Sequence, residues 1–438
     1  MRTSRLLGSG LLLTFLITLA ACDFGGGEEG DQAQIRLLNV SSGYDSVDLY
    51  TNNNDEDDDD DAKLLSAVSY KTVSAYSSVD SDTYTLKFKK AGASSTLLTL
   101  GTENLTDESH ATYVGYGPNG HFATIKISED VTDPDSGNSK VNLLNTAEAG
   151  SLDVYLTDDD ISLDDATPTF SSIDAGAAGN TTTIDSGTYR LRVTGAGDTG
   201  DLRLDVPSIT FSSKQIASII LTATPGGVLV NALVLPQEGS VTAYDNTKAR
   251  VRGAAGVANG SLVSLNIGGA NVLSNVGAGV IGAKYAQIES GAAAITLTVG
   301  GSPVSVSTPT LTAGADYTML VYTDSGATQT NLIADDNRLP SSSSLTKIRL
   351  LNGMSARGTA ITMYVDYSPV IEGTQLGQAS AYTEVDSGTD VQIDVTETNT
   401  AATLLTKTGL TLQSAAVYTM FVSGGDTLPA PGFLRKDR

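Results

Sequence analysis

The sequence predicts an all-β protein built as a tandem array of four immunoglobulin-like antiparallel β-sandwich domains behind an N-terminal signal peptide. Strand-like segments rich in Val, Ile, Thr and Tyr recur roughly every ten residues, and no long amphipathic helical segment separates them. A common pattern returns roughly every 100 residues, which indicates tandem copies of one domain. About seven strands in about 100 residues is typical of an immunoglobulin-like sandwich, with a closed barrel as the alternative.

The first 21 residues have the pattern of a secretory signal peptide. Arg2 and Arg5 precede an apolar run over residues 6–19, and the small residues Ala20 and Ala21 follow it. The run is shorter than the roughly 20 apolar residues that a membrane-spanning helix needs. We therefore expect cleavage between Ala21 and Cys22 and no transmembrane anchor.

The segment Leu19-Ala20-Ala21-Cys22 resembles the lipobox of bacterial lipoproteins. This resemblance implies that the Cys22 sulfur carries a diacylglyceryl group and that Cys22 becomes the new N-terminus. Several acyl chains anchor a protein stably where one chain does not. Residues 22–33, which are rich in Gly and acidic residues, are expected to form a flexible tether. A secreted protein with a chance cysteine is the alternative.

Two landmarks set the register of the four copies. The opening strands are expected at residues 35–39, 141–145, 249–253 and 348–352, and an acidic-Ser-Gly turn follows in each copy. Glycine would supply a positive φ in these turns, and Asp82 takes its place in the first copy. The predicted domains are residues 34–130, 139–237, 247–337 and 346–428, followed by a C-terminal tail over residues 429–438.

Short motifs shared by the copies resemble the bacterial family called domain of unknown function 4397. They are Val47-Asp48-Leu49-Tyr50, Leu152-Asp153-Val154-Tyr155 and the Asp-Ser-Gly-Thr-Tyr turn at residues 185–189. The resemblance covers nearly all of residues 34–428 and is faintest in the third copy. It implies an exported protein, often a lipoprotein, and it assigns no catalytic residue.

The composition limits the chemistry that the chain can perform. A net charge of −24 repels nucleic acid, so we expect no nucleic-acid partner. Two histidines and one cysteine give little material for a zinc cluster or a Cys-His nucleophile. His110 and His121 flank one strand and could approach each other across a hairpin. We therefore predict that the protein is not an enzyme, although the many aspartates leave room for a glycan hydrolase.

Two acidic loops are candidate calcium sites. In the first copy the candidate ligands are Asp55, Asp57, Asp59 and Asp61, and in the second copy they are Asp158 and Asp160. Clustered carboxylates can supply the six to eight oxygen atoms that calcium takes. A solvated loop is favoured because the glycine of a calcium-binding turn is missing. No other cofactor is predicted.

These observations predict a non-catalytic lipoprotein of the bacterial cell envelope. It would be a scaffold or binding module for an unidentified protein or polysaccharide, held on the outer membrane rather than the inner membrane and facing the periplasm or the cell surface. The alternatives are a glycan-active envelope hydrolase and a surface stalk that calcium makes rigid.

Overall fold

A computed structural model describes residues 31–53, 61–258, 260–355, 357–424 and 427–438. The predicted signal peptide, Cys22 and most of the first acidic loop lie outside these residues. The described part is all-β, with one short 3-10 helix (η1, Leu163–Asp165), and this confirms the predicted fold class. No helix in the described part is long and apolar enough to cross a membrane.

Each domain consists of an inner and an outer sheet, and the hydrophobic core lies between them. In domain one the core includes Ile35 and Leu37 from the inner sheet and Leu49 and Phe88 from the outer sheet. The inner sheet of domain one contains β4 (Thr72–Val73), β5 (Ser77–Asp80), β1 (Gln32–Asn39), β8 (His110–Tyr116) and β9 (Ala123–Ser128). Its outer sheet has the order β3 (Ala62–Ser69), β2 (Ser46–Asn53), β6 (Asp82–Lys90) and β7 (Thr96–Leu105).

The other three domains repeat this plan. The inner sheet of domain two contains β13 (Ala177–Ala178), β14 (Thr182–Asp185), β10 (Asn138–Asn145), β17 (Ile216–Ala223), β18 (Val230–Pro236) and β19 (Thr242–Tyr244). The inner sheet of domain three contains β23 (Val280–Ile281), β24 (Ala286–Glu289), β20 (Lys248–Gly256), β29 (Asp316–Asp324) and β30 (Ala327–Asp335). The inner sheet of domain four contains β34 (Thr383–Asp386), β31 (Leu345–Gly353), β37 (Ala416–Ser423) and β38 (Gly432–Lys436).

The outer sheets have four strands each. They are β12 (Phe170–Ile173), β11 (Leu152–Thr157), β15 (Gly187–Gly195) and β16 (Asp198–Phe211) in domain two; β22 (Ala270–Val276), β21 (Val263–Ile267), β26 (Ile295–Val299) and β27 (Ser302–Val304) in domain three; and β33 (Ser368–Thr374), β32 (Ile361–Val365), β35 (Gly388–Glu397) and β36 (Thr403–Leu412) in domain four. Domain three has an additional small sheet of β25 (Gly291–Ala292) and β28 (Thr310–Leu311).

One detail of the strand pairing differs from a wholly antiparallel sandwich. In every domain the opening strand pairs in parallel with the late core strand, as β1 does with β8 and β31 with β37. Between these two strands the chain crosses to the outer sheet and comes back. The late core strand therefore runs in the same direction as the opening strand. Alternation of apolar and polar residues reports burial and not strand direction, so the sequence pattern could not show this.

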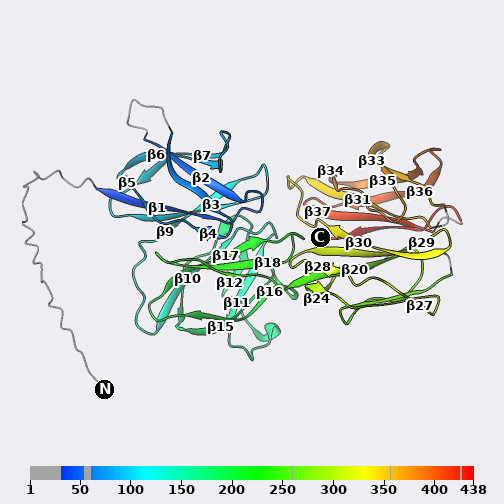
Figure 1. Ribbon diagram of the computed structural model, residues 1–438, viewed down its shortest axis with the longest axis horizontal. Coiled ribbons are helices and arrows are strands. Elements are labelled where there is room, and N and C mark those ends of the chain that lie inside the picture. Colours follow the sequence, from blue (N-terminus) through cyan, green and yellow to red (C-terminus); the bar gives the residue numbers. More distant parts are fainter. Residues whose placement is uncertain (1–30, 54–60, 259, 356, 425–426) are drawn as a thin grey trace, which may run out of the picture.

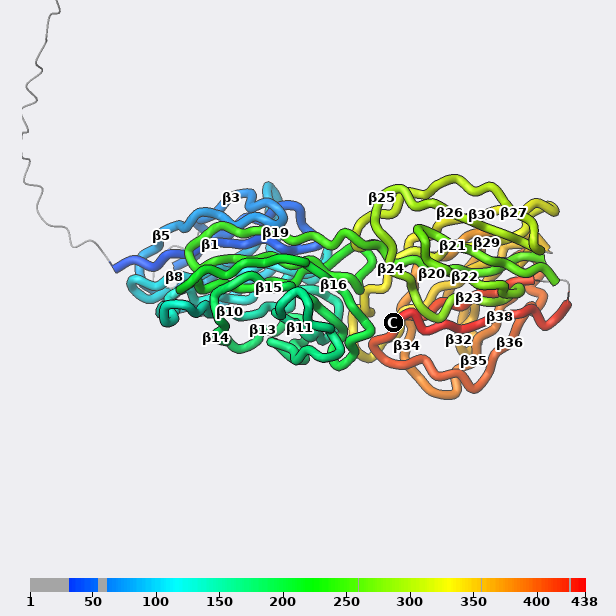
Figure 2. The backbone as a smooth tube through the Cα atoms, turned by 90° about the horizontal axis from the view of Figure 1, so that it is seen from below, coloured from blue at the N-terminus to red at the C-terminus, as the bar shows by residue number. Residues whose placement is uncertain are grey.

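The domains associate in two pairs through their inner sheets. Domains one and two form the first pair, in which Leu38, Val114, Leu144 and Ile220 pack together between the two inner sheets. Domains three and four form the second pair, with a smaller cluster that includes Leu320 and Phe421. Each pair is thus four layers of sheet, and the two pairs lie end to end (Figures 1 and 2).

The prediction of a C-terminal tail at residues 429–438 is wrong for the central part of this segment. Residues Gly432–Lys436 form β38, which pairs with β37 at the edge of the inner sheet of domain four. Gly432, Arg435 and Lys436 make this short segment look like a polar tail in the sequence. Its edge position explains these residues, because edge strands commonly carry charged side chains.

The acidic-Ser-Gly landmark is not a hairpin turn. Strand β14 ends at Asp185 in the inner sheet, and β15 begins at Gly187 in the outer sheet, so the landmark is where the chain crosses between sheets. Of the landmark glycines, only Gly291 has a positive φ, of 97°. The expectation of a left-handed glycine therefore holds in domain three alone.

Candidate functional site

A cleft of about 610 Å³ lies where domains one and two meet the second pair. Loops of domain one contribute Asp45, Tyr70 and Lys71, domain two contributes Asp245, and the segment after domain three contributes Arg338. This volume is within the range of about 300–1,000 Å³ found for small-ligand sites, and such sites prefer domain interfaces.

Tyr70 and Lys71 occupy the tight turn between β3 and β4. The Tyr70 N–H donates to the carbonyl of Asp45 (2.8 Å), and the Lys71 N–H donates to the carbonyl of Asn39 (2.7 Å). Lys71 has a left-handed φ of 58°, a conformation that a non-glycine residue keeps only where its surroundings hold it. The backbone therefore fixes the direction of both side chains.

The Lys71 ammonium joins domain one to domain two across the cleft. It forms an ion pair with Asp245 and lies 5.4 Å from the centroid of the Tyr70 ring. The carboxylate of Asp245 is 62 % exposed, so the pair borders solvent and contributes little to stability. The charged groups of the Lys71–Asp245 pair are thus available to a ligand.

Asn246 holds the linker between domains two and three against the cleft. Its side-chain amide donates to the carbonyls of Arg203 (2.7 Å) and Val230 (3.1 Å), and its side-chain oxygen accepts from the Lys248 N–H (2.9 Å). Its own N–H donates to Oδ1 of Asn231 (2.9 Å). This satisfied network makes the linker a fixed wall of the cleft.

The second pair forms one side of the cleft and docks through close backbone contacts. The Gly226 N–H donates to the carbonyl of Gly314 (2.9 Å), and the Asn337 N–H donates to the carbonyl of Gly226 (3.0 Å). Arg438 donates through Nη1 to the carbonyl of Gly227 (2.7 Å), and burial lowers the pKa of its guanidinium. The geometry of the cleft thus depends on how the two pairs dock.

Arg338 contributes a fixed cationic group to the cleft. Its Nε and Nη2 donate to the two carboxylate oxygens of Asp336 at 2.8 and 3.0 Å, and this pairing raises the pKa of Arg338. Lys71 and Arg338 offer donors, Asp45 and Asp245 offer acceptors, and Tyr70 offers an aromatic face. Mixed donors and acceptors beside a ring suit a neutral ligand with many hydroxyl groups better than a highly charged one.

The structure places the described candidate calcium ligands apart. Asp61 binds Lys87 (2.6 Å) and Lys89 (3.0 Å), which lower its pKa, while Asp158 and Asp160 are exposed. Strands β2 and β11, which precede the two acidic segments in the sequence, belong to different outer sheets of the first pair. Asp55, Asp57 and Asp59 lie outside the described residues, as do Ala21 and Cys22. The described residues contain no cluster of three or more potential metal ligands.

The two histidines are not brought together. His110 begins β8, where Nδ1 lies 3.1 Å from Oδ1 of Asp130 and the ring packs edge-on against Tyr76. His121 follows the turn after the other end of β8 and is exposed. The suggested approach across a hairpin is wrong because the hairpin places them at opposite ends of the strand.

Sequence reasoning missed a buried ionic network between domains three and four. Arg252 and Arg349 are each 1 % exposed, and the side chains of Asp335 and Asp437 are 0 % exposed. Arg349 donates to Asp335 of domain three (2.6 Å), and Arg252 donates to Asp437 of domain four (2.5 Å). The signal in the sequence was an arginine in an otherwise apolar opening strand, as in Ile348-Arg349-Leu350.

Arg252 and Arg349 each stack on a tyrosine, and each donates hydrogen bonds to two threonines, Thr318 and Thr419. Arg252 lies over Tyr285 (4.7 Å) and Arg349 over Tyr382 (4.8 Å). The Nε atoms of Arg252 and Arg349 donate to Thr318 and Thr419, both at 2.9 Å. Each Nη2 then reaches the other threonine, so the network is nearly symmetric across the domain interface.

Comparisons with solved structures give only remote likenesses. A carbohydrate-binding module of family 26 from Eubacterium rectale Amy13K, solved with maltoheptaose, has 11% identity and a TM-score of 0.16, covering 48% of this chain and 96% of its own. The multi-modular glycogen-degrading pneumococcal virulence factor SpuA has 10% identity and a TM-score of 0.16, covering 85% of this chain and 37% of its own. No curated protein matches the chain.

The comparison with family models gives the clearer result. Residues 33–155 match DUF4397, a domain of unknown function, and this segment contains domain one and ends within β11 of domain two. The repeated pairs of sheets suggest further domains of the same kind in the rest of the chain. The protein is thus a repeat of β-sandwich domains, of which residues 33–155 match the model of a domain of unknown function.

Proposed function

We propose that the protein is a non-catalytic lipoprotein of the bacterial cell envelope that binds a neutral polysaccharide in the cleft at the junction of the two pairs. Lipid on Cys22 would hold the chain on a membrane, with the outer membrane favoured, and the Gly-rich tether would separate the domains from the lipid. The net charge of −24 disfavours anionic polymers and membrane surfaces as ligands.

The observation that carries this proposal is the composition of the cleft. Lys71, Asp245 and Arg338 come from three parts of the chain and line the cleft together with Tyr70. Sugar hydroxyl groups both donate and accept hydrogen bonds, and the apolar face of a sugar ring packs on an aromatic ring. An open cleft also lets a long polymer pass through, which an enclosed pocket would not.

Replacing Tyr70 with alanine is expected to weaken glycan binding about tenfold, because large aromatic side chains carry a major part of the binding energy at such sites. The measurement is affinity electrophoresis of the whole chain through gels that contain neutral or acidic polysaccharides, followed by calorimetry with the best ligand.

Tyr367→Ala is the matched control, because Tyr367 is 76 % exposed in the turn between β32 and β33 of domain four and does not line the cleft. Equal losses for Tyr70→Ala and Tyr367→Ala would contradict a site in the cleft. Shortening of the polysaccharide during the assay would favour the hydrolase instead.

Replacing Cys22 with alanine is expected to move the protein from the membrane fraction to the soluble fraction, because a lipobox without its cysteine cannot receive acyl chains. Fractionation of cells that express the wild type or the variant measures this. Cleavage of the wild type by protease added to intact cells would place the domains on the cell surface, and protection would place them in the periplasm. Unchanged fractionation of the variant would rule out anchoring through Cys22.

A further inference from the structure

The strand that follows the late core strand occupies the same place in all four inner sheets. These strands are β9, β18, β30 and β38, and their register makes Ile125, Leu233, Asn331 and Phe433 equivalent. Ile125 and Leu233 pack between the inner sheets of the first pair, and the Asn331 side chain donates to the carbonyl of Gly377 (2.9 Å) in domain four. Phe433 is 49 % exposed, so its side chain is the least covered of the four.

Domain two shows how the outer edge of this strand can be completed. Strand β19 runs antiparallel along β18, with Tyr244 opposite Ala232 and Thr242 opposite Val234. Leu233, which lies between these two pairs, is fully buried. The strand β19 belongs to the linker toward domain three, but its pairing with β18 is ordinary strand addition, which an extended segment of another protein can also provide.

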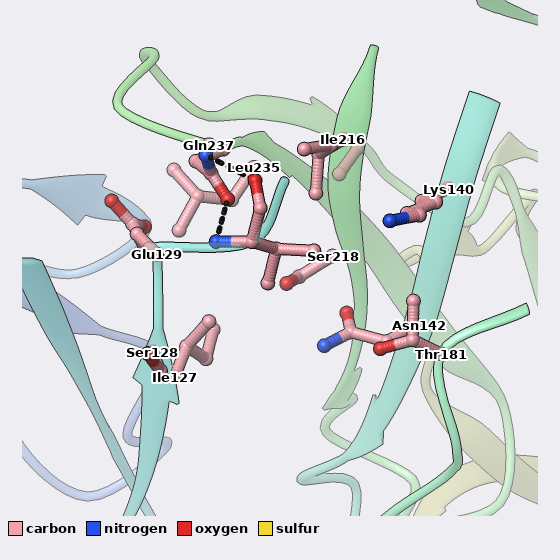
Figure 3. A pocket seen from close by; sticks show the side chains of 12 residues that line it. Ile127, Ser128, Glu129, Lys140, Asn142, Thr181, Ile216, Ser218, Leu235 and Gln237 are labelled. Atoms are coloured by element: carbon pink, nitrogen blue, oxygen red, sulfur yellow. Dashed lines mark hydrogen bonds between the residues drawn. The ribbon is translucent and has the colours of Figure 1, made fainter. Parts of the chain in front are cut away.

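The face of β18 that points to domain one is covered as well. Leu235 belongs to the apolar cluster between the two inner sheets. Gln237, which directly follows the strand, donates to the carbonyl of Val131 and accepts from its N–H, both at 3.2 Å (Figure 3). Strand β18 therefore has neighbours both along its edge and on this face.

Strand β38 has an open edge instead. It is the last strand of its sheet in the described part of the chain, with β37 on its other side. The Ser423 N–H of β37 donates to the carbonyl of Pro431 (2.9 Å), just before β38. Because the backbone bonds of an antiparallel pair involve every second residue, the N–H and carbonyl groups of Gly432, Leu434 and Lys436 point away from β37.

Apolar side chains border this edge. Phe433 is half-exposed, and Val280, in the domain-three strand β23 that contacts β38, is 38 % exposed. The Arg435 guanidinium lies 4.9 Å from the centroid of the Phe433 ring and donates through Nη2 to the carbonyl of Ile281 (3.2 Å). The edge is thus continuous with the interface between domains three and four. An open edge beside exposed apolar side chains is a template for a further strand.

The charges of β38 indicate which kind of strand fits. Arg435 and Lys436 donate to oxygen atoms of Ile281 and Gln413, and neither forms an ion pair with a carboxylate of the described residues. A second copy of β38 would bring two more basic side chains to this edge, and two chains of net charge −24 repel each other. Acidic side chains on the incoming strand would instead complement Arg435 and Lys436.

We propose that β38 is a docking edge for an extended acidic segment of a partner protein, which adds antiparallel to the inner sheet of domain four as β19 adds to β18. In the register of β19, the segment places an aromatic residue opposite Gly432, a small residue opposite Phe433, and acidic residues opposite Arg435 and Lys436. This edge is separate from the cleft, and the inference does not rest on the proposed glycan ligand.

Peptide binding to the whole chain tests the proposal. The probe is Glu-Glu-Thr-Ala-Tyr, whose last three residues copy residues 242–244, followed by a tryptophan as a fluorescent reporter, since the chain has none. Saturable binding with a Kd below about 1 mM is expected, and a peptide with lysines in place of the glutamates should bind at least tenfold more weakly. Absence of saturable binding of the acidic peptide up to about 1 mM would overturn the proposal.

Backbone methylation of the peptide distinguishes strand addition from other modes of binding. In β19, the N–H groups of Thr242 and Tyr244 point to β18 and that of Ala243 points away. Methylation of the threonine or tyrosine nitrogen of the peptide is therefore expected to weaken binding at least tenfold, and methylation of the alanine nitrogen less than threefold. Equal effects at all three positions would rule out pairing with an edge.

Variants of the chain place the site. Lys436→Pro removes an N–H at the open edge, whereas Lys436→Ala removes the same charge and keeps the N–H, so the proline variant should bind the acidic peptide at least threefold more weakly than the alanine variant. Phe433→Ser is expected to weaken binding about fivefold and remains a test should Lys436→Pro not fold. Ile161→Ser is the matched control, because Ile161 is 40 % exposed in domain two.

Two outcomes would overturn the assignment even if the peptide binds. Binding that Phe433→Ser and Lys436→Pro leave unchanged would place the site elsewhere. Sedimentation of the chain without peptide tests a second copy as the occupant. A dimer that forms in the wild type and is lost in Phe433→Ser would show that β38 pairs with another copy of this chain and not with an acidic partner.

Discussion

Replacing Asp335 with asparagine is expected to lower the free energy of unfolding of the second pair by about 3–5 kcal/mol, the cost of removing one partner of a buried ion pair. The Asp335 carboxylate accepts hydrogen bonds from Arg349 (2.6 Å), Thr318 (2.6 Å) and Tyr285 (2.6 Å) and lies 3.8 Å from Arg252. Its loss leaves two buried guanidinium groups with Asp437 as the remaining acid. Urea unfolding followed by circular dichroism measures the change.

Glu289→Gln is the matched control for this prediction. Glu289 pairs with Lys248 in the same domain, but its side chain is 70 % exposed, so the expected change is below about 0.5 kcal/mol. Similar losses in the free energy of unfolding for both variants would contradict a stabilisation that comes from the buried network.

The pH dependence gives a second check on Asp335. Burial alone would raise its pKa, but Arg349 and Arg252 outweigh burial and lower it below the usual value. A carboxyl whose pKa is depressed in the folded state stabilises the fold above its unfolded pKa of about 3.9, and this stabilisation disappears as the pH falls through the folded pKa. The difference between wild type and Asp335→Asn should therefore be constant near neutral pH and shrink only below about pH 4.

The repeat landmarks in the sequence predicted the fold because they hold the sandwich together. Asn39 ends β1, and its side-chain amide donates to the carbonyls of Tyr44 and Val68, both at 3.1 Å, which ties the inner sheet to the outer sheet. Asn352 does the same in domain four, with Thr359 and Thr374 at 2.9 Å. Such structural requirements leave a pattern in domains one, two and four, whereas domain three has Ala255 at this position. A pattern that repeats can be read from one sequence.

The Asp of the Val-Asp-Leu-Tyr motif is structural for the same reason. Asp48 accepts a hydrogen bond from the Ala67 N–H (2.7 Å) and pairs with Lys63 (2.7 Å), while Asp153 accepts from the N–H groups of Ser172 (2.6 Å) and Gly197 (2.8 Å). These acids satisfy backbone groups where β2 and β11 pair irregularly with their neighbours. The motif that carries the family resemblance therefore locates a fold element and not an active site.

The cleft could not be predicted in this way. Tyr70, Asp245 and Arg338 belong to three different domains or linkers. The residues that line the cleft are therefore not a motif repeated in the four copies. Their proximity depends on the packing of the inner sheets within the first pair and on the docking of the second pair. Neither depends on a local sequence pattern, because loops that meet at a domain junction need only fit their particular neighbours.

Replacing Gly226 with valine is expected to separate the two pairs and weaken ligand binding in the cleft more than tenfold. A Cβ atom at this position would lie 2.6 Å from Cγ and 2.7 Å from the backbone nitrogen of Asp316. Asp316 cannot move away, because it is buried and bonded to Arg250 (2.7 and 2.6 Å) and Asn337 (2.7 Å). The clash must therefore be relieved by movement of one pair relative to the other.

Small-angle scattering and calorimetry on the same samples test this prediction. The variant should have a larger radius of gyration and weaker binding, while the urea transitions of the two pairs stay close to those of the wild type, since their separate cores are untouched. Gly277→Val is the matched control, because no atom lies within 4 Å of a Cβ atom built there. Full binding by a Gly226→Val protein with an enlarged radius would show that the ligand contacts one pair alone, since a site made by both pairs cannot survive their separation.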